Sequence, residues 1–181
     1  MCLPHTPHME NEETPVIVPE AEPIKANPLD SIKVTDEEKE AFFKSFLSDE
    51  PYRERISLFD GRFTAVVRSL TVQENDDVVR QIRKDVVSGL AAKDEAYYVK
   101  LITYRLALSL VELNGEPFAP EISHTSLPTD KDTYVSRKAD KLLAWSVHKL
   151  AGLQDAFKKF ELKLMKLTAT LDDPVFWKAG A

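Results

Sequence analysis

The chain has 181 residues, of which 43% are hydrophobic and 30% charged, with only 5 glycines and a net charge of −6. A chain of this length can bury a core of its own, since a domain of about 150 residues buries roughly two thirds of its unfolded surface. The scarcity of glycine disfavours glycine-rich phosphate loops. The acidic balance lacks the basic footprint of a nucleic-acid-binding protein, so no nucleic-acid partner is expected.

The single cysteine, Cys2, cannot form a disulfide within the chain, so the fold does not depend on an oxidising compartment. The sequence has neither a basic segment followed by an apolar export signal nor a run of about eighteen apolar residues. We therefore expect a soluble intracellular protein that does not associate with a membrane.

Residues 1–30 are expected to form an extended arm. They contain six of the 11 prolines, and their six acidic side chains against one lysine give this arm a net charge of −5. Prolines disfavour helix, so the arm is predicted to be polyproline-like unless a partner orders it. Within it, the apolar patch Val16, Ile17 and Val18 could add to a neighbour's sheet edge, and a solvated tail is the alternative.

A first helix is predicted after the capping box formed by Thr35 and Glu38, and it should end near Ser48. Three phenylalanines fall on one side of it, and we expect them to be buried against the body of the protein because aromatic side chains bury large areas. These residues are Phe42, Phe43 and Phe46.

A β-hairpin is predicted next, because the apolar pattern changes to a period of two on both sides of Asp60-Gly61. A two-residue loop would pair Phe59 with Arg62, Leu58 with Phe63 and Ile56 with Ala65. The apolar residues then share one face. The other face is solvated and basic, and it carries Arg55, Ser57, Phe59, Arg62, Thr64 and Arg68.

Two more helices complete a body spanning residues 31–115. The first follows a capping box of Thr71 and Glu74 and should stop near Gly89, with an apolar stripe of Val78, Val79, Ile82, Val86 and Val87. The second runs from Asp94 to Leu113, with Asn114-Gly115 as its stop, and it is predicted to be the central core helix.

Residues 116–129 contain three prolines and are expected to form an exposed linker. Residues 130–181 then form a long C-terminal helix followed by a Phe/Trp tail. The helix could run unbroken to Leu171, about 60 Å, and Gly152 marks the expected bend. The predicted fold class is mainly α with one short β-hairpin (α+β), in which a helical body carries this long helix and the N-terminal arm.

The long helix carries an apolar seam in which seven residues follow each other at spacings of three and four. Its members are Leu150, Leu153, Phe157, Phe160, Leu164, Leu167 and Leu171. Such a stripe leaves water only by packing on another surface. We predict the seam to be a partner-binding surface, with Phe176 and Trp177 as an anchor beyond its end. The alternative is that the seam packs on the chain's own helices.

No catalytic, cofactor or metal site is expected. Cys2, His5 and His8 are close together but too few for a tetrahedral zinc site on an extended arm. His124 and His148 have no neighbouring nucleophile or metal-binding motif.

Charged residues near apolar positions are predicted to have structural roles. Arg105 lies in the most apolar helix and needs a carboxylate partner there, for example a glutamate of the first helix. Glu74, Asp76 and Asp77 stand at a helix start, where capping and the helix dipole account for them.

Three segments in a fixed order resemble small tail proteins of tailed bacteriophages. They are the helix and hairpin of residues 42–71, the apolar run of residues 104–115 and the closing residues 172–177. The resemblance covers about residues 36–177 and is to proteins described as tail assembly chaperones or as tail and baseplate components.

This resemblance implies a non-enzymatic role in tail morphogenesis, most directly that of a tail assembly chaperone. The expected partners are other phage tail proteins, namely the tape measure, tail tube or baseplate subunits, or a second copy of the chain. The long arm departs from a typical chaperone and keeps a structural subunit of the tail, baseplate or neck as the alternative. The implied location is the host cytoplasm during assembly, or the virion tail.

Overall fold

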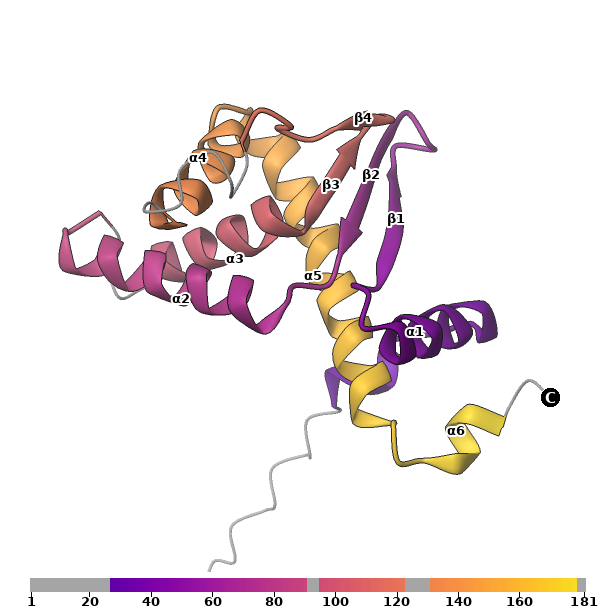
Figure 1. Ribbon diagram of the computed structural model, residues 1–181. Coiled ribbons are helices and arrows are strands. Elements are labelled where there is room, and N and C mark those ends of the chain that lie inside the picture. Colours follow the sequence, from indigo (N-terminus) through magenta and orange to yellow (C-terminus); the bar gives the residue numbers. More distant parts are fainter. Residues whose placement is uncertain (1–26, 91–94, 123–130, 179–181) are drawn as a thin grey trace, which may run out of the picture.

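The computed structural model describes residues 27–90, 95–122 and 131–178 (Figure 1). The helices are η1 (Pro28–Ser31, a 3-10 helix), α1 (Asp36–Ser48), α2 (Val72–Val87), α3 (Glu95–Ser109), α4 (Lys131–Leu143), α5 (Val147–Ala169) and α6 (Pro174–Lys178). The strands are β1 (Arg53–Leu58), β2 (Phe63–Arg68), β3 (Leu110–Leu113) and β4 (Glu116–Pro117). They form one antiparallel sheet in the order β1-β2-β3-β4, so the predicted α+β class is confirmed.

Parts of the predicted arm and linker lie outside the described residues. These parts are residues 1–26, with Cys2, His5, His8 and the patch Val16, Ile17 and Val18, and residues 123–130, with His124.

Both predicted capping boxes are present. The Thr35 hydroxyl accepts from the Glu38 N–H at 3.3 Å, and the Thr35 N–H donates to Glu38 Oε2 at 2.8 Å. Thr71 and Glu74 repeat this reciprocal pair at the start of α2. Because each box satisfies main-chain donors that have no partner inside the helix, the sequence defines both helix starts locally.

The predicted hairpin forms with the predicted register, in which Ile56 pairs with Ala65 and Leu58 with Phe63. Its turn is longer than expected. Phe59 has a left-handed φ of 54°, so Phe59 and Arg62 stay in a four-residue turn, closed by the Arg62 N–H donating to the Phe59 carbonyl at 3.2 Å.

The predicted helix from Asp94 to Leu113 is wrong in its last turn. The chain leaves α3 after Ser109, and Leu110–Leu113 pairs with β2 as a third strand. Asn114 and Gly115, with φ of 51° and 86°, then form a hairpin turn into β4 instead of a helix stop. Pairing with the open edge of the hairpin overrides the helical preference of this leucine-rich run.

The predicted long C-terminal helix is confirmed by the 23-residue α5, but it is not continuous from residue 130. Its break lies at residues 144–146, between α4 and α5, and Gly152 sits inside the continuous α5. The Trp145 ring packs edge-on against Phe63 of the hairpin and lies 3.8 Å from the Lys149 Nζ. This contact between distant segments holds the reversal, so the break needs neither proline nor glycine.

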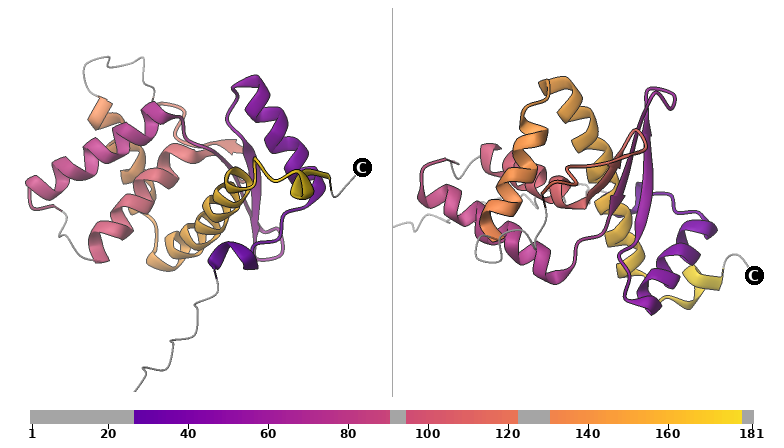
Figure 2. Two further views of the ribbon diagram at one scale, coloured as in Figure 1. Left: turned by 90° about the horizontal axis from the view of Figure 1, so that it is seen from below. Right: turned by 45° about the horizontal axis from the view of Figure 1, so that its top comes forward.

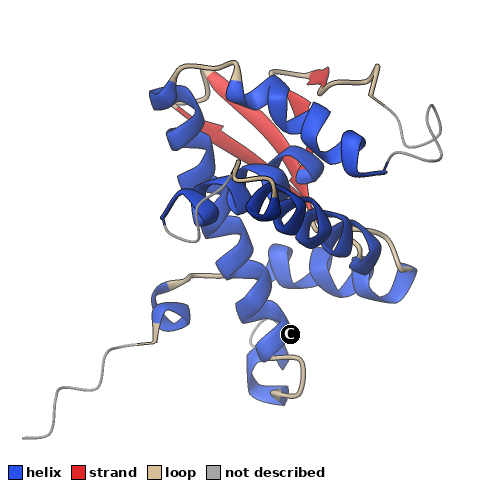
Figure 3. Cartoon of the chain, turned by 90° about the vertical axis from the view of Figure 1, so that its left-hand side faces the viewer, coloured by secondary structure: helices blue, strands red, loops and turns tan. Residues whose placement is uncertain are grey.

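The elements pack around one core. Figure 1 shows α2, α3 and α4 on one side of the molecule and the sheet on the other, with α5 passing between them and on to α1 and α6. Figure 3 shows the strands gathered at one end and α5 extending beyond them. The buried cluster takes residues from both the predicted body and the C-terminal segment, for example Val67 and Leu153. Among the described residues, no helix is both long and apolar enough to cross a bilayer.

Candidate protein-binding surface

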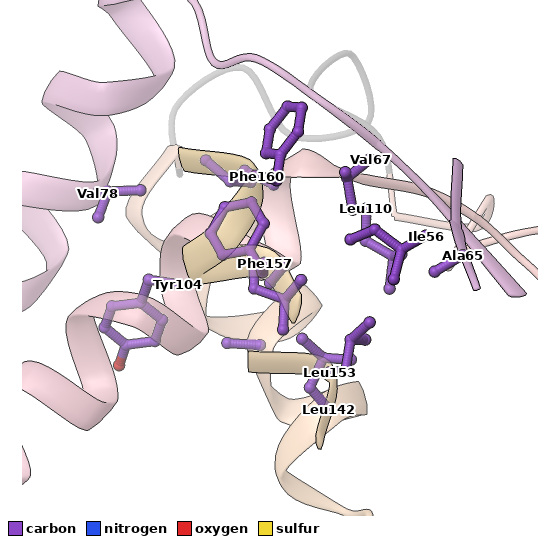
Figure 4. Close-up of a cluster of buried hydrophobic side chains, with 14 of the residues drawn as sticks. Ile56, Ala65, Val67, Val78, Tyr104, Leu110, Leu142, Leu153, Phe157 and Phe160 are labelled. Carbon is purple, nitrogen blue, oxygen red and sulfur yellow. The ribbon is translucent and has the colours of Figure 1, made fainter. Parts of the chain in front are cut away.

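The centre of the predicted seam lies in the core of the chain itself. Leu153, Phe157, Phe160 and Leu167 are at most 2% exposed. Figure 4 shows the first three of them facing Ile56, Val67 and Leu110 of the sheet. The expectation that these four residues meet a partner is therefore corrected, because the sheet and α3 already cover this stripe.

The outer residues of the seam are half-buried. Leu150, Leu164 and Leu171 pack against the core cluster but keep part of their surface. A partner-binding role for these three stays a prediction.

The predicted anchor packs on α1. The Trp177 ring stacks on Phe42 and contacts Phe43, with ring centroids 6.4 and 6.3 Å apart. Lys39 donates to the Phe176 carbonyl at 2.9 Å and lies over the Phe176 ring. Both views of Figure 2 show α6 beside α1. Phe176 and Trp177 therefore hold α6 against α1, and each of the two side chains is half-buried.

An open apolar groove of about 650 Å³ lies between η1, α3 and α5, and we call it the α5 groove. Its apolar walls come from all three helices and from the connection between β2 and α2. They are Leu29, Leu70, Leu101, Ile102, Phe157, Phe160, Leu164, Met165 and Ala169. Met165 is 58% exposed at its rim. Concave, mostly apolar surfaces of this size are typical of binding sites.

The charged residues of the α5 groove neutralise each other. Arg105 Nε lies 2.5 Å from Glu161 Oε1, and Arg105 Nη1 donates to Asn75 Oδ1 at 3.0 Å. The predicted ion pair of Arg105 is thus present, but its partner belongs to α5 instead of α1. The groove offers an occupant apolar contacts and no net charge.

The aromatic first helix leaves most of its apolar side chains in solvent. Phe42 is buried as expected, whereas Phe43, Phe46 and Leu47 are 49%, 57% and 68% exposed. The expected burial of Phe43 and Phe46 is wrong because only one face of α1 meets the core. We call these three exposed residues the α1 surface.

Phe46 of the α1 surface lines a second hollow, which lies next to the α5 groove. This hollow, of about 600 Å³, is lined by Phe46 and Val72 and also by Ser69 and Leu70, which line the groove as well. Phe46 and the α5 groove are therefore neighbours on either side of Ser69 and Leu70.

Ion pairs fix α1 against α5 and β1 next to this region. Lys163 Nζ lies 2.5 Å from Glu38 Oε1 and 2.8 Å from Glu54 Oε1. Burial by itself raises the pKa of the Glu38 carboxyl, but hydrogen bonds from Lys163 and Thr35 outweigh it, so this pKa lies below its ordinary value.

The acidic residues of α2 do more than cap it. Both terminal nitrogens of Arg68 donate to the Glu74 carboxylate. The Arg68 side chain is therefore bound to α2 and is not solvated as predicted for this face of the hairpin. Asp77 is 1% exposed and lies 3.2 Å from Arg80 Nη1. On the apolar stripe, Val78 and Ile82 are buried, whereas Val87 is exposed.

A buried polar cluster between α2 and α3 was not predicted. The Asp85 carboxylate accepts from Lys100 Nζ at 2.8 Å, from Gln81 Nε2 at 3.0 Å and from the Tyr104 hydroxyl. Burial raises the pKa of Asp85, but these three donors together bring it below its ordinary value. The four-residue spacing of Gln81 and Asp85 was the only available signal, and it is common on solvated helices.

The described residues hold no group of three or more His, Cys, Asp and Glu side chains placed to bind a metal ion. His148 is exposed on α5. The polar clusters join neighbouring elements, and the α5 groove and the α1 surface offer apolar contact area.

Comparisons of the chain with protein-family models, with curated proteins and with solved structures found no significant match.

Proposed function

We propose that the protein is a non-enzymatic bacteriophage tail morphogenesis protein, a tail assembly chaperone that binds an apolar segment of another tail protein. One observation carries the binding role. A groove with apolar walls is open, and the exposed Phe46 lines the hollow next to it. Exposed apolar residues near a concave apolar site are typical of a protein-binding region. The assignment to phage tails depends on the sequence resemblance.

The occupant that fits best is the apolar face of an amphipathic helix, such as a helix of the tape measure protein. The groove walls are mostly helices, and the ion pair of Arg105 with Glu161 within them is neutral overall. A helix binds such a groove through apolar anchors at spacings of three, four and seven residues. Met165 at the rim supports this role because its flexible side chain adapts to different neighbours.

Co-expression with the tail genes tests the binding role. Met165→Glu places a charge at the rim of the groove and should weaken capture of the partner at least about tenfold, since burying an unpaired charge is costly. Val147→Glu is the matched control, because it replaces a 79% exposed apolar residue of the same helix away from the groove. Equal capture by both variants would contradict the proposed site.

A permanent structural subunit of the tail, baseplate or neck is the second candidate. It is favoured by the acidic, proline-rich segment that precedes η1, because virion components can link to neighbouring subunits through such arms. Quantitative mass spectrometry of purified virions separates the two roles. A chaperone should be absent from them, whereas a stoichiometric copy number would establish the structural role.

A further inference from the structure

The sheet ends in a strand whose outer edge is open. In the order β1-β2-β3-β4, β1 is an edge strand, and Figure 1 shows no other described element beyond it. The edge is six residues long, whereas β4 at the opposite edge has only two. An edge of this length offers unpaired main-chain groups to another strand.

The hydrogen bonds identify which residues of β1 offer these groups. The Ser69 N–H donates to the Tyr52 carbonyl at 2.8 Å, so Tyr52 faces β2. The Thr64 N–H donates to Asn114 Oδ1 at 2.9 Å, so the main-chain groups of Thr64 point toward β3 and away from its cross-strand partner Ser57. The main-chain N–H and C=O groups of successive residues point to alternate sides of a strand. Those of Arg53, Arg55 and Ser57 therefore point outward, away from β2.

The same edge is positively charged. The side chains of Arg53 and Arg55 on β1 and of Arg62 in the adjoining turn are exposed. Within the described part of the chain, none of the three has an ion-pair partner. Glu112 shares this face of the sheet but lies on β3, with β2 between it and β1. A strand with acidic ends therefore suits this edge.

We propose that residues 14–20 of the same chain, which lie outside the described residues, form a fifth strand antiparallel to β1. The positions of the prolines support this pairing. Pro15, Ile17 and Pro19 alternate with Val16 and Val18. When Val16 and Val18 bond to β1, both prolines face outward, where no N–H is needed. The prolines then also block a further strand.

One register brings complementary residues opposite each other on each face of the sheet. It places Glu20 opposite Arg53, Val18 opposite Arg55 and Ile17 opposite Ile56. The acidic residue then meets the basic end of β1, and the isoleucine extends the apolar face. Cross-strand pairs of opposite charge and of apolar residues both stabilise antiparallel strands.

The chain is long enough to make this contact within one molecule. Lys163 of α5 binds Glu54 at the start of β1, and Lys166 donates to the carbonyl of Ile32, just after η1. The two lysines are about 4.5 Å apart along the helix axis, so the start of β1 and the residue after η1 contact the same part of α5. Residues 21–26 can add a span of up to about 20 Å when extended.

Amide hydrogen exchange in the full-length chain tests the pairing. Val18→Pro removes a main-chain N–H that would donate to β1. The outward amides of Arg53, Arg55 and Ser57 should therefore exchange at least about tenfold faster in this variant than in the wild type. Ile17→Pro is the matched control, because the N–H it removes faces outward, and it should keep most of the protection. The amides of Glu54 and Ile56, which face β2, should stay protected in every variant and report an intact fold.

Three results would overturn the proposal. The first is fast exchange of the outward amides in the wild type, and the second is an equal loss of protection in Val18→Pro and Ile17→Pro. The third is protection that appears only together with a concentration-dependent dimer in sedimentation, because the arm of a second copy would then occupy the edge. The pairing is independent of the function proposed above.

Discussion

The indole ring of Trp177 stacks on the phenyl ring of Phe42 at a centroid distance of 6.4 Å and an interplanar angle of 20°. This contact joins α6, the last described helix, to α1. The Trp177 Nε1–H also donates to the Thr170 carbonyl at 2.6 Å, which ties α6 to the end of α5. One side chain thus holds three helices together next to the α1 surface.

Trp177→Ala should destabilise the protein by about 2 kcal/mol, because it removes the stacking on Phe42 and the hydrogen bond to Thr170. Urea unfolding followed by circular dichroism measures this loss. Val175→Ala, at a 75% exposed position of the same helix, should change the free energy of unfolding by less than about 0.5 kcal/mol. Similar values for both variants would mean that α6 does not dock on α1.

Phe157→Ala should cost about 4 kcal/mol, and Phe157→Glu should abolish cooperative unfolding, because Phe157 is 1% exposed in the core. Thermal unfolding monitored by circular dichroism tests both. Met165→Glu, two helical turns further along α5 at an exposed site, should cost less than about 1 kcal/mol. A folded Phe157→Glu protein that had only lost a partner would instead place the seam at an intermolecular interface.

Gly152→Ala should stabilise the protein by about 1 kcal/mol, because Gly152 lies within α5 and an added Cβ meets no atom within 4 Å. Gly89→Ala should destabilise it by about 1 kcal/mol. Its Cβ would meet equally open space, but the φ of 70° is unfavourable for alanine. Chemical denaturation of both variants measures the change in the free energy of unfolding, which should have opposite signs in the two. A destabilising Gly152→Ala would contradict an unbroken α5.

Asp85→Asn should destabilise the protein by about 3 kcal/mol at pH 7, because it removes the buried charge that Lys100 and Tyr104 bind. The folded pKa of Asp85 lies below its ordinary value of about 3.9. Its contribution is therefore complete above that value and is lost as the pH falls through the folded pKa.

The gap in unfolding free energy between the wild type and Asp85→Asn should accordingly shrink as the pH falls below about 4. Urea midpoints measured between pH 7 and pH 2.5 test this. Asp155→Asn is the control, since Asp155 is exposed and its bond to Lys158 is on the surface. A gap that stays constant with pH would show that the Asp85 carboxylate does not stabilise the fold through its charge.

The features that could be predicted from the sequence depend on contacts between close neighbours. Both capping boxes join residues three apart, at Thr35 and at Thr71. The hairpin register around Ile56 follows from a short turn and a period of two, which agree with each other. Local geometry and one apolar face leave a single arrangement for these elements.

The third strand has a local signal that fits two different structures. Asn114-Gly115 fits both a helix stop and a two-residue hairpin turn. The leucine-rich run before it has no clear period, so the choice depends on the free edge of β2, which is distant in sequence. The α4–α5 break depends similarly on the contact of Trp145 with Phe63.

By itself, the sequence determined the two capped helix starts, the hairpin and the apolar stripe of α5, because each requires only neighbouring residues. The tertiary structure decided what the stripe packs against. The sheet and α3 cover Leu153, Phe157 and Phe160, while Met165 and Phe46 remain in solvent. A periodic pattern shows that a face must be covered but carries no information on which surface covers it, because hydrophobic burial is non-directional.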